Sequence, residues 1–270
     1  FARKMKRPAF VLDSKRLRNS SAHIHTYADP FLFVDENHLY LFLESQAVGE
    51  PGKIEVLRSS NGRDFEFAGE VLRKPFHLSF PFVFRWNDEI LLMPESLETE
   101  EVSIYRFVEF PTKVEKWRTL LRGAFKDSSL TFHNGFWYFF TTSPSGLELY
   151  YTDDLEHGHL IPHPKNPLCT ETRYSQCGGS PVALDGRLYR IAQDCSQEYG
   201  RNISILSIDE MTRSNYRESI LIDDFFDLDH TWNSRGGHHL SVVQFNGNRV
   251  IAVDGKQDDL LVNKIMSVFY

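Results

Sequence analysis

The chain has 270 residues, of which 41% are hydrophobic and 25% are charged, and its formal net charge is −7. This composition is typical of a folded globular protein, and the negative charge argues against nucleic acid as a partner because phosphate binding favours a basic face. The chain has no apolar run of the roughly 18–20 residues that a membrane-spanning helix needs, so the sequence predicts no membrane span.

An apolar hairpin recurs five times along the chain. The first copy, DPFLFVDENHLYLFLES at 29–45, has a close counterpart in FPFVFRWNDEILLMPES at 80–96. The later copies are SSLTFHNGFWYFFTTS at 128–143, SPVALDGRLYRIAQD at 180–194 and HLSVVQFNGNRVIAVD at 239–254. Turn signals such as HNG, LDG and FNGN divide each copy into two strands. The copies start 51, 48, 52 and 59 residues apart, and a period of this size indicates a repeat architecture.

Two further strands follow the hairpin in most copies, and four short antiparallel strands make one propeller blade. The sequence therefore predicts an all-β, five-bladed β-propeller that forms a single domain over 1–270. The blades are expected to start near residues 29, 80, 127, 180 and 239. The fifth copy runs out of chain before its last strand, and RPAFVL at 7–12 is expected to supply that strand. A β-sandwich, which also uses alternating strands, is the structural alternative.

Polar residues recur at two positions of the hairpin. The strand-start position, before the proline of the first strand, holds Asp29, Phe80, Ser128 (with Asp127 adjoining), Ser180 and His239. The hairpin-end position, at the end of the second strand, holds Glu44, Glu95, Ser143, Asp194 and Asp254. Antiparallel pairing places these two positions side by side, so both sets are expected at one mouth of the central channel. Clustered carboxylates shift one another's pKa, as acid/base cleavage of a glycosidic bond requires. Each could instead simply accept backbone hydrogen bonds in a turn.

Three motifs resemble the five-bladed furanosidase-type propellers of glycoside hydrolase family 43 and its relatives in families 32 and 68. They are YADPFLF, FKDSSLTF and GGHHLSVV. The resemblance implies that Asp29 is the base or nucleophile and that Asp127 tunes a pKa or holds the sugar. It also implies a histidine at the channel centre, sometimes on a metal ion. The acid departs from the family pattern, because QCGGSPVA at 176–183 has no Glu. The residues that could replace it are Glu95, Asp194, Glu198 and Glu171.

A closer resemblance covers nearly the whole chain. The segments ADPFLF, SFPFVF, LMPES, DSSLTF, GGSP, LYRIAQDCSQEYG and GHHLSVV are similar to the N-terminal propeller domain of plant glucosamine inositolphosphorylceramide transferases. In those proteins a separate C-terminal domain resembles the glycosyltransferase. The resemblance implies a glycan or glycoconjugate substrate and a covalently linked transferase domain as partner.

These observations predict a carbohydrate-active domain that cleaves or transfers a glycosyl unit. Asp29 would be the base, Asp127 the orienting carboxylate, and Glu95 or Asp194 the acid. The residues expected to bind substrate are His25, Tyr27, Phe80, Arg190, Gln193, Tyr199, His230, Trp232, His238 and His239. The alternative is a non-catalytic glycan-binding or accessory domain of a larger glycosyltransferase or polysaccharide-biosynthesis protein, since the expected Glu is missing.

No cofactor and no metal site are predicted. The chain has neither a Cys/His set with zinc spacing nor a Gly-rich phosphate loop, although a cation between Asp29 and His238 or His239 stays open. DLD at 227–229 is read as an acidic surface loop and not as the metal motif of a nucleotide-sugar transferase. Three cysteines are too few for a disulfide framework in a chain this long, and they indicate no compartment.

Overall fold

The computed structural model describes the backbone of residues 10–12, 24–228, 232–256 and 264–269, and the side chains of 26–228 and 232–256. In these residues the strands form five antiparallel sheets, and the only helical element is a short 3-10 turn, η1 (Leu97–Thr99). No helix in the described part of the chain has the length and apolar character to cross a membrane.

The sheets are numbered here in chain order. Sheet 1 holds β2 (Ile24–Asp35), β3 (His38–Ala47), β4 (Lys53–Ser59) and β5 (Glu66–Leu72). Sheet 2 holds β6 (Ser79–Trp86), β7 (Glu89–Glu95), β8 (Glu101–Glu109) and β9 (Lys113–Arg122). Sheet 3 holds β10 (Lys126–His133), β11 (Phe136–Ser143), β12 (Gly146–Thr152) and β13 (Ile161–Pro162).

The last two sheets are less regular. Sheet 4 holds β14 (Gln176–Cys177), β15 (Val182–Leu184), β16 (Arg187–Asp194), β17 (Asn202–Met211) and β18 (Tyr216–Ile222), with both β14 and β15 paired to β16. Sheet 5 holds β19 (Leu240–Phe245), β20 (Asn248–Gly255) and β21 (Lys264–Phe269). Its outer strand is β1 (Phe10–Leu12), which pairs antiparallel with β21.

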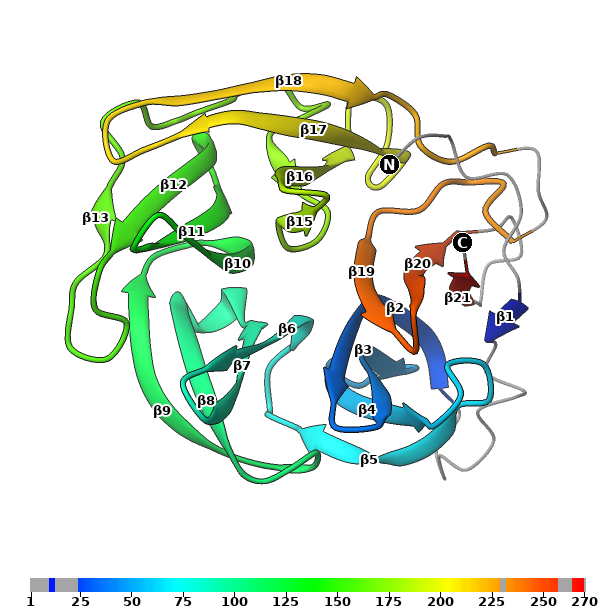
Figure 1. The fold of residues 1–270 in the computed structure, drawn as a ribbon. Coiled ribbons are helices and arrows are strands. Elements are labelled where there is room, and N and C mark those ends of the chain that lie inside the picture. The colour runs from blue at the N-terminus through cyan, green and yellow to red at the C-terminus, as the bar shows by residue number, and fades with distance from the viewer. Residues whose placement is uncertain (1–9, 13–23, 229–231, 257–263, 270) are drawn as a thin grey trace.

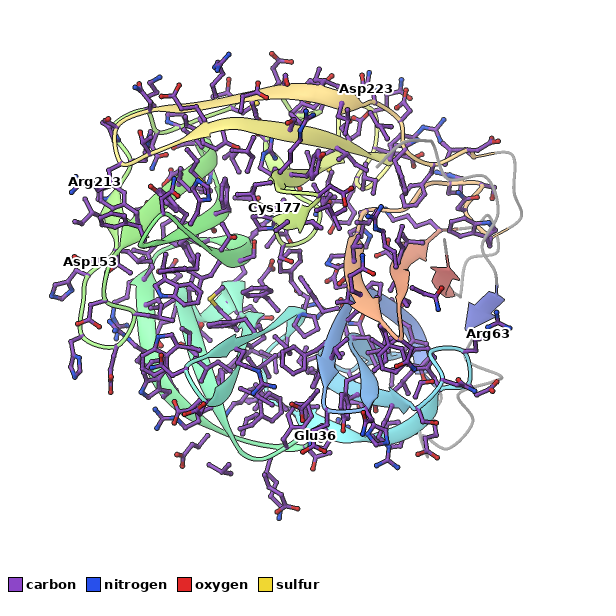
Figure 2. All side chains as sticks on the ribbon, in the orientation of Figure 1. Glu36, Arg63, Asp153, Cys177, Arg213 and Asp223 are labelled. Atoms are coloured by element: carbon purple, nitrogen blue, oxygen red, sulfur yellow. The ribbon has the colours of Figure 1, made fainter. Side chains whose placement is uncertain are left out.

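The sheets surround a common axis, with β6, β10 and β19 near the centre and β5, β9 and β18 at the rim (Figure 1). In Figure 2, Cys177 of sheet 4 lies near the centre and Asp223 lies toward the outside. Apolar side chains fill the spaces between neighbouring sheets: one cluster joins sheets 4 and 5, and another joins sheets 5 and 1. This radial arrangement confirms the predicted all-β propeller and excludes two stacked sheets.

The predicted hairpin turns are confirmed by their backbone angles. Asn134-Gly135, Asp185-Gly186 and Asn246-Gly247 each have φ values between 48° and 84° at both residues. Two consecutive positive φ values define the type I′ turn, whose twist matches that of the flanking strands, and Asn-Gly or Asp-Gly is its preferred sequence.

A β-bulge recurs in the first strand of sheets 1, 2 and 3. The register shifts between Ala28 and Phe31 in β2, between Ser79 and Phe82 in β6, and between Lys126 and Ser129 in β10. Inside each bulge one residue has left-handed φ: 51° at Asp29, 45° at Phe80 and 50° at Asp127. A non-glycine residue in this region is uncommon and is often found at functional sites.

The bulge corrects the sequence alignment of the third copy. The strand-start position of sheet 3 is occupied by Asp127 and not by Ser128, because Asp127 shares the bulge position and the φ value of Asp29. Its hairpin-end partner is accordingly Thr142, which pairs with Lys126, and not Ser143. The third copy has Ser128 where the first two copies have Pro30 and Pro81, so the proline that marks the strand-start position is missing from it.

Candidate functional site

A pocket of about 360 Å³ lies beside the three bulges. Four carboxylates from sheets 1, 2 and 3 line it: Asp29, Glu44, Glu95 and Asp127. The other charged or polar side chains around it are Thr26, His77, Ser79, Lys126, Gln176, Tyr199, His238 and Lys256. The repeated hairpin therefore brings the strand-start residues of sheets 1 and 3 and the hairpin-end residues of sheets 1 and 2 into one concave site.

Asp29 connects the pocket to sheets 2 and 5. Its Oδ2 accepts a hydrogen bond of 2.9 Å from the backbone N–H of Phe80, and its Oδ1 lies 3.4 Å from Nε2 of His238. Burial raises the pKa of Asp29 to about 6, with repulsion from Asp254 and Glu95 adding to the effect and His238 opposing it. Asp29 therefore carries its charge at neutral pH and can accept a proton in slightly acidic solution.

Glu44 forms a second pair with His77. Oε1 of Glu44 lies 3.3 Å from Nε2 of His77, and Nδ1 of His77 accepts a 3.0 Å hydrogen bond from the backbone N–H of Gly52. Burial raises the pKa of Glu44 to about 8, with repulsion from Asp29 contributing and His238 opposing. Glu44 is therefore mostly protonated at pH 7, unlike Asp29.

Glu95 and Asp127 form the third group of the pocket. Oε2 of Glu95 accepts a 2.9 Å hydrogen bond from the backbone N–H of Asp127, and Oδ2 of Asp127 accepts a 3.2 Å bond from Nε2 of Gln193. Burial raises the pKa of both carboxyls, and the charge of Glu95 raises that of Asp127 further. The two carboxyls can share one proton, as do other neighbouring carboxyls that cannot both ionise.

His238 lies between Asp29 and Asp254 and forms an ion pair with each of them. Nδ1 of His238 lies 2.6 Å from Oδ2 of Asp254, whose Oδ1 accepts the backbone N–H groups of His238 and His239 at 2.8 and 3.0 Å. Burial lowers the pKa of His238, but Asp254 and Asp29 outweigh it and raise the pKa to about 8. Burial would raise the pKa of Asp254, but the His238 charge and hydrogen bonds hold it well below its usual range.

The same three side chains have the spacing of a cation site. Ligand atoms of Asp29, His238 and Asp254 lie within 4.8 Å of one another. A cation would need His238 in its neutral form, because an imidazole binds metal only through an unprotonated nitrogen. Protonated His238 lies between Asp254 and Asp29, so the three side chains form two ion pairs without a cation.

Tyr199 and Lys256 form one wall of the pocket. The Tyr199 side chain is exposed, its ring centroid lies 5.2 Å from that of His238, and Nζ of Lys256 lies 4.5 Å from the same ring. Lys256 also donates a hydrogen bond to the backbone carbonyl of Tyr199. An exposed aromatic face beside carboxylates provides a stacking surface for an apolar sugar face.

Several residues predicted to bind substrate lie inside the fold instead. His239 is fully buried against Phe31 and Phe80, with ring centroids 4.4 and 5.3 Å away, and burial lowers its pKa to about 3. It is a neutral core residue. Tyr27, Phe80 and Trp232 are likewise buried hydrophobic residues that do not line the pocket. Both faces of these aromatic rings are apolar, and the rings are buried in the apolar clusters of the fold.

Arg190 and Asp194 are also placed elsewhere. Arg190 is buried within sheet 4, where Nε and Nη2 bind the two oxygens of Glu218 at 2.8 and 2.6 Å. Asp194 lines a different pocket of about 310 Å³ with Arg173, whose Nε lies 3.5 Å away. The next residue back, Gln193, faces the centre because side chains alternate along a strand. His230 lies outside the described residues, as does the side chain of His25.

Some pocket residues were not predicted as site residues. Glu44 was recognised only as a member of the repeat, and Lys126 only as a neighbour of Asp127. Lys256 and His77 lie outside the repeated hairpins and carry no pattern of their own. For His77 the only sequence signal is its place just before the strand-start segment SFPFVF.

Residues 8–256 match the family described as glucosamine inositolphosphorylceramide transferase 1, N-terminal. The chain belongs to this family. It is 33% identical over 264 residues to glucosamine inositolphosphorylceramide transferase 1 of Arabidopsis thaliana, a match that covers 91% of this chain and 34% of the relative. The protein of the same name from Oryza sativa subsp. japonica is 33% identical over 244 residues, or 84% of this chain and 33% of the relative. The chain thus spans about a third of the length of these relatives.

Solved structures with the same fold include glycoside hydrolases. The catalytic domain of a GH62 α-L-arabinofuranosidase from Coprinopsis cinerea superposes with a TM-score of 0.70 and 11% identity, covering 99% of this chain and 96% of that chain. A Bacillus subtilis arabinanase superposes with a TM-score of 0.64 and 14% identity, covering 92% of this chain and 95% of that chain. The glucosamine inositolphosphorylceramide transferase N-terminal family therefore has the propeller fold of these enzymes.

Proposed function

We propose that this chain is a carbohydrate-active propeller domain whose acidic pocket acts on a glycosidic bond of a glycan or glycoconjugate. The supporting observation is the convergence of four carboxylates from three sheets on one pocket. Two of them, Asp29 and Glu44, have pKa values separated by their environments, which is the arrangement that acid/base chemistry needs. In this proposal the five sheets are the five blades of one domain over 1–270, and β1 belongs to the last blade.

Asp29 is the proposed base, because it is the more acidic of the two and faces the pocket. Asp127 is the proposed orienting carboxylate, held in place by Gln193. The sequence left Glu95 or Asp194 as candidates for the acid, and Asp194 is dropped from the proposal because it lines another pocket. The proposal needs no metal ion, and a cation among Asp29, His238 and Asp254 stays a separate prediction that metal analysis of the purified protein would test.

A screen of aryl glycosides and natural glycans with the wild type and with Asp29→Asn tests this proposal. Asparagine keeps an oxygen that can accept the Phe80 N–H but cannot act as a base. We expect turnover by the wild type and a loss of about 10²–10⁴-fold in the variant. Glycan binding by both proteins with turnover by neither would contradict the proposal.

That contrary outcome corresponds to a second candidate function, a glycan-binding or accessory domain. The observation that favours it is the use of carboxylate oxygens as structural acceptors: Asp29 and Glu95 each accept a backbone N–H from the next sheet. In addition, the segment Gln176–Cys177 and the glycines after it supply no carboxylate to the pocket. A binding domain would need neither an acid nor a base.

The relatives also suggest a physical partner. They are about three times as long as this chain and are named as transferases, while the matching family is their N-terminal part. We therefore propose that the propeller works beside a covalently linked transferase domain and handles the same glycoconjugate. Comparing transfer by a full-length relative with and without Asp29→Asn at the matching position would test this link.

A further inference from the structure

We infer that Glu44, positioned by His77, is the general acid that protonates the leaving-group oxygen. This inference rests on the proposed glycosidic chemistry of the pocket. It places the acid on β3 of sheet 1, beside the proposed base Asp29 on β2, and so does without the glutamate that is missing from sheet 4.

The hydrogen bonds of His77 determine which of its nitrogens faces Glu44. Nδ1 accepts the Gly52 N–H at 3.0 Å, so in neutral His77 the ring proton is on Nε2. Nε2, which then carries the ring proton, lies 3.3 Å from Oε1 of Glu44, within ion-pair distance. An acidic proton on Glu44 is then expected on Oε2, and the carboxylate formed when that proton leaves has the His77 Nε2 3.3 Å from its Oε1.

Glu44 is largely buried but still lines the pocket, as a general acid must if a substrate is to reach it. The Glu44 side chain is 9% exposed and lines the pocket, while His77 is 39% exposed at its edge. Removal from water favours the neutral carboxyl, which explains a pKa of about 8. The charged or titratable groups that face Glu44 come from five other segments: Asp29 on β2, His77 before β6, Glu95 on β7, His238 before β19 and Asp254 on β20.

The other pocket carboxylates are engaged in ways that suit an acid less well. Oε2 of Glu95 accepts the backbone N–H of Asp127, and Oδ2 of Asp127 accepts Gln193. Asp29 accepts Phe80 and lies beside His238, which favours its ionised form. Among the described residues, neither oxygen of Glu44 accepts a backbone N–H, and His77 at the pocket edge is its ion-pair partner at 3.3 Å.

Gly52 has a close fit to the pair. A Cβ at this position would lie 2.7 Å from Cε1 of His77, 2.7 Å from the carbonyl oxygen of Leu78 and 3.0 Å from Oε1 of Glu44. The Leu78 carbonyl belongs to the backbone and cannot move away cheaply. Gly52→Ala therefore disturbs the contact between His77 and Glu44 without removing a titratable group.

The proposed step balances as a hydrolysis. The Glu44 carboxyl transfers its proton to the glycosidic oxygen while the bond between the anomeric carbon and that oxygen breaks, so the leaving group departs as a neutral alcohol. Asp29 takes a proton from the water whose oxygen forms the new bond to the anomeric carbon. Glu44 is left as a carboxylate beside Nε2 of His77, Asp29 is left protonated, and solvent carries that one proton from Asp29 back to Glu44 to reset the enzyme.

The decisive experiment compares leaving groups in wild type and Glu44→Gln. A dinitrophenolate leaves without protonation, whereas an alkoxide needs it. We expect Glu44→Gln to keep kcat/KM within about tenfold for dinitrophenyl glycosides and to lose about 10²–10⁴-fold for alkyl glycosides. Glu95→Gln is the matched control, and any loss it shows should be the same for all leaving groups. A uniform loss in Glu44→Gln, or a selective loss in Glu95→Gln, would overturn the assignment.

Two further measurements separate this inference from the proposed function. Gly52→Ala and His77→Asn should shift the basic limb of the kcat/KM pH profile, a change that a purely structural role would not produce. Infrared difference spectroscopy of wild type against Glu44→Gln should show a protonated carboxyl that titrates near pH 8. A Glu44 that titrates in the ordinary range rejects the inference even if Asp29→Asn is inactive. Absence of wild-type turnover, with Glu44 titrating near 8, rejects the proposed function instead.

Discussion

Asp29 and Glu95 each accept a hydrogen bond from a backbone N–H of the following sheet, and each is also a titratable group in the pocket. In the proposed function a single carboxyl therefore serves both chemistry and folding. A substitution that removes the charge but keeps an oxygen affects the first role, whereas a substitution to alanine affects both. Asn and Gln variants are for this reason the informative ones at this site.

The raised pKa of Glu44 has a consequence for stability. Its pKa rises from 4.5 to about 8 on folding, so the neutral folded form is penalised as pH rises through this interval, and stability falls. Gln cannot ionise and keeps an acceptor for His77. Between pH 5 and pH 8.5 we expect the free energy of unfolding of the wild type to fall relative to that of Glu44→Gln by more than about 1.4 kcal/mol, the value of one pKa unit.

Urea denaturation at several pH values measures this difference directly. The comparison cancels the titration of groups that both proteins share. Parallel curves for the two proteins over this pH range would show that Glu44 ionises equally in the folded and unfolded chain.

Within single elements, the sequence was most informative about turns and strands. The Asn-Gly and Asp-Gly pairs at 134–135, 185–186 and 246–247 predicted type I′ hairpins, because these residues tolerate positive φ, and the backbone angles confirm them. The bulges were not predicted. An inserted residue changes which side chain faces the pocket without changing composition. Asp127 was set one position away from its counterpart Asp29 because Ser128 replaces the proline that marks the position in the first copy.

Long-range contacts account for the other differences at the site. Gln193 and Asp194 are neighbours on β16 with similar polarity, and only the orientation of the strand decides that Gln193 reaches Asp127. His77 and Lys256 reach the pocket from segments outside the repeat. Sequence patterns of period two describe a strand's faces, but they do not say which face meets which neighbour.

Arg190 shows how sheet 4 uses a charge in its interior. The guanidinium is 1% exposed and binds both oxygens of Glu218, which also accepts the Tyr216 hydroxyl at 2.6 Å. Glu218→Ala leaves a buried unpaired charge, so we expect a loss of about 3–5 kcal/mol in the free energy of unfolding. Exchanging both partners, in Arg190→Met with Glu218→Leu, should recover most of that loss.

Denaturant unfolding of the two variants and the wild type measures both effects. Glycan binding serves as the control, since Arg190 does not line the pocket. A double variant as unstable as Glu218→Ala, or one that specifically loses glycan binding, would contradict this account of Arg190.

Over the whole molecule, hydrogen bonds near the axis link each sheet to the next. Sheet 1 is linked to sheet 2 by Asp29 and Phe80, and sheet 2 to sheet 3 by Glu95 and Asp127. The remaining links are Thr142 Oγ1 with the Cys177 N–H at 3.1 Å, the Gly178 carbonyl with the Leu240 N–H at 2.8 Å, and Ser241 Oγ with the Leu32 N–H at 3.0 Å. Together they form a closed series around the ring.

Because the links form a closed series, loss of one should weaken the ring as a unit. Glu95→Ala leaves the Asp127 N–H without its acceptor, so we expect a loss of about 1–3 kcal/mol in the free energy of unfolding. Glu95→Gln keeps an oxygen and should lose much less. Circular dichroism and tryptophan fluorescence should report one coincident transition for each variant. Separate transitions for the two probes would show that the sheets unfold independently.

The series of links also bears on how the pocket can change over evolutionary time. The backbone N–H groups need only an oxygen acceptor. The side-chain amides of Asn and Gln supply such an oxygen, just as the carboxylates of Asp and Glu do. Under the proposed function, a lineage can therefore exchange acid for amide, lose bond cleavage and keep an intact ring that still holds a sugar. Descendants of one ancestral enzyme can in this way become receptors without passing through an unfolded intermediate, and amides in place of Asp29 or Glu44 would mark them.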